Sequence, residues 1–256
     1  MRIVDIPATL EQMPFLSVII PAYNEERRLL KTLNPVREYL LRQDFDYEVV
    51  LVNDGSKDGT QRVAEEFAKT FPALKVLTHS PNRGKGGAVK RGMLESTGQW
   101  RLFMDADNST PLAELDKFLP HLSEADVLIG SRYLKKDSIK IKQPWKRRVG
   151  SRGFNFFVQQ MLLPGIVDTQ CGFKLFSAAA TEAIFPLQSL QRWSFDVELL
   201  TIANQLGFRI LEIPVDWYDD SSSRLNATRT ATSLMRDLRK IRRKVKGKEY
   251  AQARVK

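Results

Sequence analysis

The chain has 256 residues, of which 43% are hydrophobic and 27% are charged; this is a globular composition and excludes general disorder. Its single cysteine, Cys171, excludes an internal disulfide, and its two histidines leave no zinc-type set of ligands. Any metal must therefore bind mainly to carboxylates and phosphates.

Positive charge is in excess, with 40 basic and 30 acidic residues and a net charge of +10. This balance favours anionic partners such as phosphates, nucleic acid or anionic lipid headgroups, without choosing among them. The sequence contains neither the pattern of a secretion signal nor a run of about 18 apolar residues. We therefore expect a cytoplasmic protein, or one bound peripherally to the cytosolic face of a membrane.

The first half of the chain alternates strands and helices. The apolar run LSVII stops abruptly at the turn PAYNE, which is typical of a buried parallel strand that ends near a ligand. The same pattern predicts strands over 16–21, 48–53, 75–78, 101–105 and 127–130, with helices over 27–41, 60–71 and 86–96. Ser109, Thr110 and Pro111 are typical of a helix start. This order predicts an α/β fold with a doubly wound, mainly parallel sheet.

After Arg132 the sequence changes in character. A basic loop, KKDSIKIKQPWKRR, leads into a helix-length segment rich in aromatic and aliphatic residues, GSRGFNFFVQQMLLPG. Beyond it we expect strands over 173–176 and 209–214 and helices over 178–185 and 195–206. Because no Gly/Ser-rich linker or internal repeat interrupts the chain, we predict one domain over 1–226 with an elaborated second half, followed by a basic amphipathic C-terminal helix and tail over 227–256.

Acidic turns follow two of the predicted strands, at Asp54 and at Asp105 and Asp107. The carboxyl ends of parallel strands meet at one edge, so we expect these turns to form one site, which we interpret as a sugar-nucleotide site. Asp105 and Asp107 can project on the same side and suit Mg²⁺ or Mn²⁺, although most Asp-x-Asp pairs are caps and turns. Asp54 can equally serve the turn itself or accept a hydrogen bond from a base or ribose.

Three other segments admit two interpretations each. The glycines of NRGKGG, at 82–87, suit either phosphate contact at a helix N-terminus or structural use. The basic amphipathic helix over 229–248 has apolar residues at 234, 238, 241 and 245, and its basic face is either simply solvated or bound to a membrane. The aromatic stretch either packs into the core or guides a lipid; it contains Phe154, Phe156, Phe157, Val158, Met161, Leu162 and Leu163.

A few single residues are also candidates for the site. Trp145 is a possible interfacial anchor. Asp168 and Gln170 are candidates for the acceptor side, and Cys171 is expected to be a small buried residue. Four residues further along are candidates to border a sugar, with Asp196 as a helix cap the competing interpretation: Trp193, Phe195, Asp196 and Glu198.

Eight motifs in register carry a resemblance: IPAYNE, VNDGSKDGT, NRGKGGAVKRGM, DADNST, IGSRY, QPWKRRVGSRGFN, DTQCGFKLF and FDVELL. Together they resemble the inverting glycosyltransferases of family 2 with the GT-A fold, over about residues 15–226. Within that family they are most similar to dolichyl-phosphate glucosyltransferases, and next to dolichyl-phosphate mannosyltransferases. The resemblance implies a nucleotide-binding half over 15–130 and an acceptor half over 131–226.

The resemblance also implies roles for individual residues. The donor site would comprise Pro21, Tyr23, Glu25, Asn53, Asp54, Lys85, Asp105 and Arg224, with Asp107 and Asp105 on the metal. The acceptor phosphate would be bound by Arg132, Arg147 and Ser151. Two residues depart from the family pattern, because Asn53 replaces an acid that is often present and Asn108 stands where Leu or Gln is common.

The expected reaction follows from the acceptor. A polyprenyl phosphate is already largely dianionic at pH 7 and needs no general base, so the protein must instead hold two phosphate groups together. We therefore expect direct, inverting transfer of glucose from UDP-glucose, with GDP-mannose as the alternative donor. An anionic membrane surface is an expected partner, and a membrane protein is a further candidate partner. A nucleic-acid-binding protein is the rival class, disfavoured because acidic turns would repel a phosphate backbone.

Overall fold

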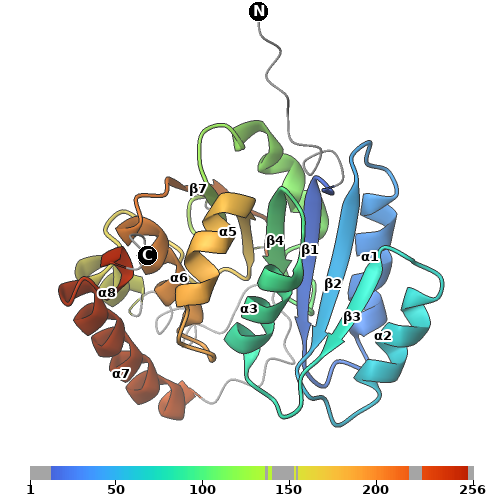
Figure 1. Ribbon diagram of the computed structural model, residues 1–256, viewed down its shortest axis with the longest axis horizontal. Helices are drawn as coiled ribbons and strands as arrows, with labels where there is room; N and C mark the ends of the chain where they lie inside the picture. Colours follow the sequence, from blue (N-terminus) through green and yellow to red (C-terminus); the bar gives the residue numbers. More distant parts are fainter. Residues whose placement is uncertain (1–12, 136–137, 140–152, 154, 219–226, 253–256) are drawn as a thin grey trace, which may run out of the picture.

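Seven strands form a single sheet in the computed structural model, which describes residues 13–135, 138–139, 153, 155–218 and 227–252 (Figure 1). The strands lie in the order β3-β2-β1-β4-β6-β5-β7. Neighbouring strands are parallel except around β6, which is antiparallel to both β4 and β5. Their bounds are β1 Leu16–Ala22, β2 Tyr47–Asn53, β3 Leu74–Thr78, β4 Trp100–Met104, β5 Val127–Ser131, β6 Phe173–Ser177 and β7 Ile210–Pro214.

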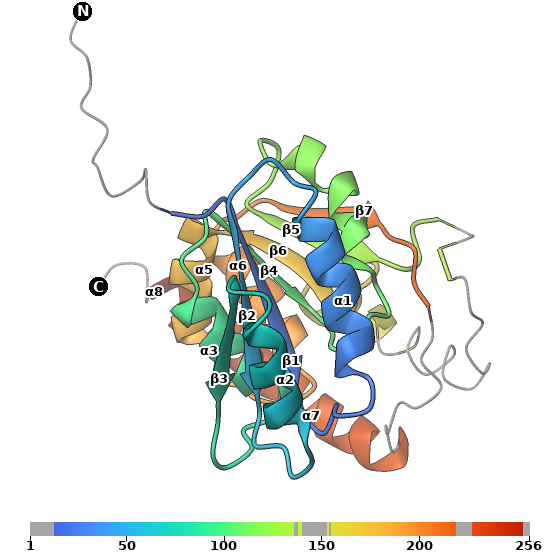
Figure 2. The ribbon, with the colours of Figure 1, turned by 90° about the vertical axis from the view of Figure 1, so that its right-hand side faces the viewer.

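Helices cover both faces of this sheet, and Figure 2 shows the strands between the two layers. The helices are α1 Leu29–Leu40, α2 Thr60–Ala68, α3 Lys85–Glu95, α5 Ala178–Ile184, α6 Phe195–Gln205, α7 Ala227–Lys246 and α8 Glu249–Gln252. Short 3-10 helices span Leu112–Lys117, Leu119–His121 and Phe185–Leu187, and residues 155–161 are helical as well.

The strands of the centre are buried on both faces. In β1, Leu16, Val18 and Ile20 pack with α1 and α2, whereas Ile19 packs with α3 and α6, and all four side chains are fully buried. Each centre strand therefore contributes alternate residues to two cores, which is why its sequence is continuously apolar. The predicted doubly wound α/β fold is confirmed.

The strand order departs from a simple parallel sheet at β6. This strand comes from the second half of the chain, yet it lies between β4 and β5 of the first half. Strand direction is set by long-range pairing, so the local pattern of 173–176 predicts the strand but not its orientation. The predicted helix start at Ser109–Pro111 is also partly wrong, since the 3-10 helix Leu112–Lys117 forms after Pro111 rather than an α-helix.

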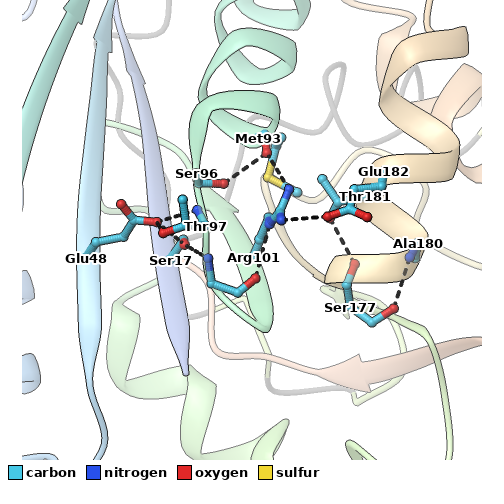
Figure 3. Close-up of polar contacts among 11 residues, drawn as sticks. Ser17, Glu48, Met93, Ser96, Thr97, Arg101, Ser177, Ala180, Thr181 and Glu182 are labelled. Carbon is cyan, nitrogen blue, oxygen red and sulfur yellow. Dashed lines mark hydrogen bonds and ion pairs between the residues drawn. The ribbon is translucent and has the colours of Figure 1, made fainter. Parts of the chain in front are cut away.

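A buried arginine, Arg101, lies at the end of the sheet opposite to the acidic turns (Figure 3). Arg101, at the amino end of β4, donates to the carbonyls of Met93 and Gly98 and to the Glu182 carboxylate, each at 3.1 Å. The Met93 and Gly98 carbonyls lie at and beyond the end of α3, where helix carbonyls lack intrahelical partners. Arg101 thus joins α3, β4 and α5 at the edge remote from the acidic turns.

The C-terminal helices pack against α6 (Figure 1). Leu238, Ile241 and Tyr250 are buried in the same core cluster as α3 and α6. The other side of α7 is basic and exposed, with Arg236, Arg239, Lys240, Arg242, Arg243 and Lys246 in contact with solvent. Within the described part of the chain, none of the helices has the length and apolar character needed to cross a membrane.

Candidate functional site

The predicted site residues that the structure describes lie at one edge of the sheet. Because β5 is antiparallel to β6 and β6 to β4, β4 and β5 run in the same direction as β1 and β2. Tyr23 follows β1, Asp54 follows β2, Asp105 follows β4 and Arg132 follows β5. Arg147, Ser151 and Arg224 lie outside the described residues, as do Phe154 and Trp145.

The Asp54 carboxylate organises the turns of this edge. It accepts hydrogen bonds from the backbone N–H groups of Arg83 at 2.9 Å and Gly84 at 2.7 Å, and its Oδ1 lies 3.0 Å from His79 Nδ1. Asp54 is only 2% exposed, so it holds the loop between β3 and α3 against the turn after β2. This is the structural use that the sequence leaves open, and a contact with base or ribose stays a prediction.

The first two turns are also joined to each other. Asn24 has a positive φ of 57°, a conformation that asparagine tolerates, and its side-chain oxygen accepts from the N–H of Lys57 at 2.8 Å. Its own N–H donates to Ser56 Oγ. Glu25 forms an ion pair with Arg28, while its N–H donates to Thr60 Oγ1 at 2.7 Å.

A polar hollow opens beside these turns. Its volume is about 700 Å³, within the range of about 300–1,000 Å³ that is usual for small-molecule sites. Asn53 contributes to its wall while its side-chain amide donates to Gln61 Oε1 at 2.6 Å. The lining comprises Tyr23, Asn53, Gly55, Ser56, Lys57, Gln61, Thr78, His79, Ser80, Pro81, Asn82 and Arg192.

Lys85, Asp105 and Asp107 form a charged cluster at the centre of the edge. Lys85 Nζ lies 2.5 Å from Asp105 Oδ1. Burial alone would lower the pKa of Lys85, but the carboxylates of Asp105 and Asp196 outweigh it and raise this pKa, so the amine stays charged. The Asp105 carboxylate lies directly against Gly172, where any Cβ would overlap it. Gly172 is therefore required for the position of Asp105.

Asp107 is the carboxylate of this cluster that most needs a cation. It accepts a hydrogen bond from the N–H of Ser109 at 2.9 Å, yet burial, and then the charge of Asp105, raise its pKa. Two carboxylates that repel each other fit a divalent cation, which would relieve that repulsion. Among the described residues, no three acidic, histidine or cysteine side chains are placed to bind one metal ion together, so the remaining ligands of an ion would be water or phosphate oxygens.

A buried ion pair between Lys174 and Asp196 lies near this charged cluster. Lys174 is fully buried, lies 2.5 Å from Asp196 Oδ1 and donates to the carbonyl of Cys171 at 2.6 Å. Asp196, in the first turn of α6, is thus an ion-pair partner, and Ser194 rather than Asp196 precedes the helix as its N-cap. Cys171 is fully buried, as expected.

Arg132 is held by a carboxylate fork. Its Nε and one Nη lie 2.7 and 2.8 Å from the two oxygens of Asp168, which also accepts from the backbone N–H of Arg132. Burial alone would raise the pKa of Asp168, but Arg132 outweighs it and lowers this pKa. The guanidinium also lies 5.5 Å from the ring of Trp217. Asp168 therefore orients Arg132, and contact of either residue with an acceptor phosphate stays a prediction.

The glycines of 82–87 allow close packing. A Cβ at Gly84 would lie 2.7 Å from the carbonyl oxygen of Gln191, and a Cβ at Gly86 would lie 2.7 Å from Phe195 Cβ. The N–H of Gly87 donates to the same Gln191 carbonyl at 3.2 Å. Structural use of these glycines is thereby explained, because the segment 191–195 crosses directly over them.

The aromatic stretch is buried in one part and exposed in another. Val158, Leu162 and Leu163 are buried in the core. Phe156 and Phe157 are 59% and 50% exposed, and their ring centroids are 6.0 Å apart. Packing into the core is therefore confirmed for Val158, Leu162 and Leu163, and contact of Phe156 and Phe157 with a lipid stays a prediction.

Comparison with known proteins identifies the family. A family model described as glycosyl transferase family 2 matches residues 17–185. The chain belongs to glycosyltransferase family 2. The resemblance noted in the sequence and the predicted enzyme class are confirmed.

Relatives of this glycosyltransferase carry one recurrent name, dolichyl-phosphate beta-glucosyltransferase. The protein from Dictyostelium discoideum is 36% identical over 241 residues, covering 89% of this chain and 74% of the relative. The Homo sapiens protein is 38% identical over 225 residues, covering 82% and 69%. The Saccharomyces cerevisiae protein is 34% identical over 247 residues, covering 89% and 74%.

Solved structures confirm the GT-A fold of this glycosyltransferase. Mannosyl-3-phosphoglycerate synthase from Rubrobacter xylanophilus aligns with a TM-score of 0.69 at 14% identity, covering 90% of this chain and 75% of that one. Glucosyl-3-phosphoglycerate synthase from Mycobacterium tuberculosis, in complex with Mn²⁺, UDP and glucosyl-3-phosphoglycerate, aligns at 0.60 and 15% identity, covering 94% and 80%. At these identities the likeness concerns the fold alone.

The sequence analysis did not identify two basic residues near the site, Lys174 and Arg192. Lys174 interrupts an otherwise apolar strand, FKLF, and a lysine in a buried strand is a detectable signal for a paired carboxylate. Arg192 lines the hollow from a segment more than 100 residues away from β3, and no local pattern marks it.

Proposed function

We propose that this glycosyltransferase moves glucose from UDP-glucose to a dolichyl-type polyprenyl monophosphate with inversion at the anomeric carbon. The observation that carries the proposal is the cluster of Lys85, Asp105 and Asp107, at the same edge of the sheet as Arg132. An acidic pair with a lysine suits a metal-bound diphosphate, and an oriented guanidinium suits a second phosphate. The names of the relatives support glucose and dolichyl phosphate.

On the donor side, Asp107 and Asp105 would hold Mg²⁺ or Mn²⁺, which when bound neutralises charge on the diphosphate and so improves the leaving group. Lys85 adds a fixed positive charge beside Asp105. The polar hollow at the ends of β2 and β3 has the size to take the nucleoside, with Tyr23 and Asn53 in its wall. Pro21, Glu25, Asp54 and Arg224 belong to the same proposed donor site.

On the acceptor side, Arg132, Arg147 and Ser151 would bind the lipid phosphate. The phosphate is itself the nucleophile, since its second pKa is about 6 and it is largely dianionic at pH 7. The protein therefore supplies no general base in this proposal. Its contribution is to orient two anions that would otherwise repel each other, through charge-assisted hydrogen bonds.

We propose that the reaction takes place at the cytosolic face of a membrane, with the protein bound peripherally. The exposed basic face of α7 and the exposed pair Phe156 and Phe157 support this, because cations attract anionic headgroups and aromatic rings favour the interface. We also propose that the enzyme binds a membrane-protein partner.

One incubation tests the proposed reaction. The purified protein is given Mn²⁺, a polyprenyl phosphate and, in separate arms, labelled UDP-glucose, GDP-mannose or UDP-GlcNAc. We expect labelled lipid with UDP-glucose, and none when the phosphate is omitted or replaced by free polyprenol. Product with GDP-mannose alone would assign the alternative donor, and no labelled lipid in any arm would contradict the proposal.

A further inference from the structure

A short segment of the chain borders the proposed donor site without belonging to any strand of the sheet. Residues 188–194 connect α6 with the 3-10 helix Phe185–Leu187, which directly follows α5. Within this segment Arg192 lines the polar hollow, and the carbonyl of Gln191 accepts a hydrogen bond from the N–H of Gly87. The side-chain amide of Gln188 donates to the carbonyl of Gly86 at 2.9 Å. The segment 188–194 therefore determines where the start of α3, with Lys85, lies.

A single buried carboxylate holds this segment. Glu198, on α6, is fully buried and accepts hydrogen bonds from the N–H of Ser189 at 2.9 Å, the hydroxyl of Ser189 at 2.6 Å and the N–H of Leu190 at 2.6 Å. A buried charge is stable only when it is fully hydrogen-bonded or paired. Glu198 and the segment 188–194 therefore depend on each other.

The C-terminal helices complete the hydrogen bonding of that carboxylate. Tyr250, on α8, is buried, and its hydroxyl donates to Glu198 Oε1 at 2.9 Å. Lys244, on α7, donates to Ser189 Oγ at 2.8 Å and lies 3.5 Å from the same Glu198 oxygen. At the other end of the segment, the Ser194 hydroxyl donates to Asp237 of α7 at 2.6 Å.

These contacts connect the C-terminal helix and tail to the segment 188–194. Tyr250 lies near the end of the described chain, and burial, followed by the charge of Glu198, raises the pKa of its phenol, so that it stays protonated and donates. The only described donors that come to Glu198 from outside the segment 188–194 are Tyr250 and Lys244.

We propose that α7 and α8 position the donor site by way of Glu198 and the segment 188–194, with Tyr250 and Lys244 as the positioning residues. The inference rests on the proposed function, since it takes the hollow and Lys85 as the place where the nucleotide binds. It does not depend on the identity of the sugar or of the acceptor.

The decisive variant is Tyr250→Phe, which removes one hydroxyl and keeps the ring in the core. Loss of one hydrogen bond to a buried carboxylate should raise the dissociation constant of UDP in the presence of Mn²⁺ by about three- to tenfold in calorimetry. The KM for the lipid acceptor should stay within about twofold. Lys244→Met should act in the same direction on UDP.

A matched control separates positioning from stability. Ile241→Val removes one buried methyl group from α7 and lowers the melting temperature, but it removes no hydrogen bond of Glu198 or of the segment 188–194. We expect its affinity for UDP to equal that of the wild type. An unchanged affinity in Tyr250→Phe, or an equal loss in Ile241→Val, would overturn the inference.

Hydrogen exchange gives a readout that does not need a ligand. The amides of Ser189 and Leu190 donate to Glu198, so in Tyr250→Phe they should exchange at least about fivefold faster, while those of β3 should not change. Equal exchange in both proteins would also overturn the inference. If the wild type bound neither UDP nor UDP-glucose, the proposed function itself would fail, and the exchange rates would still decide whether the C-terminal helices hold the segment.

Discussion

At the scale of single residues, the aspartates of the site edge differ in what balances their charge. Asp54 receives two backbone N–H groups, Asp105 lies beside Lys85, and Asp168 is paired with Arg132. Asp107 has no ion-pair partner among the described residues, and its pKa is raised. Charge that the protein leaves unbalanced is typical of a functional position, which favours Asp107 as a metal ligand.

Replacing Asp107 by asparagine should separate activity from stability. We expect Asp107→Asn to lower metal-dependent turnover by about two orders of magnitude or more, because a bound cation supplies several kcal/mol. Its melting temperature without metal should be unchanged or higher, since the substitution removes a repulsion. Asp44→Asn, an exposed site before β2 at the opposite edge, is the control. Full turnover in Asp107→Asn would exclude the metal role.

The fork between Asp168 and Arg132 predicts a dependence of stability on pH. Asp168→Asn leaves a buried guanidinium without its partner and should cost about 3 kcal/mol of unfolding free energy at pH 7, as measured in urea. The folded pKa of Asp168 is lowered, so its contribution is complete above the unfolded pKa of about 4 and is lost as the pH falls through the folded value. The difference between wild type and variant should therefore shrink below pH 4. A difference that is constant from pH 7 to pH 3 would contradict this account.

At the scale of elements, the amphipathic pattern of α7 predicts which side is buried but not what buries it. Leu238 and Ile241, on the predicted apolar side, are in the core, together with Tyr250 of α8. Because the apolar side of α7 already packs against α6, the exposed residues of α7 that the structure describes beyond Met235 are basic. Membrane association through this helix should therefore be electrostatic and weaken with salt.

A charge-reversal variant tests that association. Arg239→Glu, Lys240→Glu and Arg243→Glu together should weaken binding to phosphatidylserine vesicles by at least about tenfold, since each cation near the surface contributes about 1 kcal/mol. The matched control reverses three exposed cations on and beside α1 and α2, Lys31, Arg42 and Lys69, with the same change in net charge. Equal losses in a flotation assay would show that net charge acts, not the helix.

At the scale of the whole molecule, the two halves predicted from the sequence are one folding unit. β5 belongs to the first half by sequence, yet it pairs only with β6 and β7, which both come from the second half. Without β6, the first half would leave an apolar edge of β4 unpaired, and such edges aggregate. The strand pairing therefore argues against a folding boundary near residue 130, and the division of the two halves by function stays a prediction.

Truncation tests this unity. A fragment of residues 1–130 should fail to give a cooperative urea transition and should elute as aggregate in gel filtration, whereas the full chain should unfold in a single step. The reason is that β4 loses its partner β6 and β5 loses both of its partners. A monomeric fragment with a cooperative transition would show that the nucleotide-binding half folds alone.

The amino-acid sequence by itself determined the order of strands and helices and the acidic turns that follow β2 and β4, because hydrophobic periodicity and turn chemistry act over a few neighbouring residues. It also carried the family motifs. Only the tertiary structure decided that β6 lies antiparallel between β4 and β5, that Asp168 orients Arg132, and that Tyr250 reaches Glu198. Each of these joins residues tens of positions apart, and such contacts depend on how whole elements pack, which no local pattern encodes.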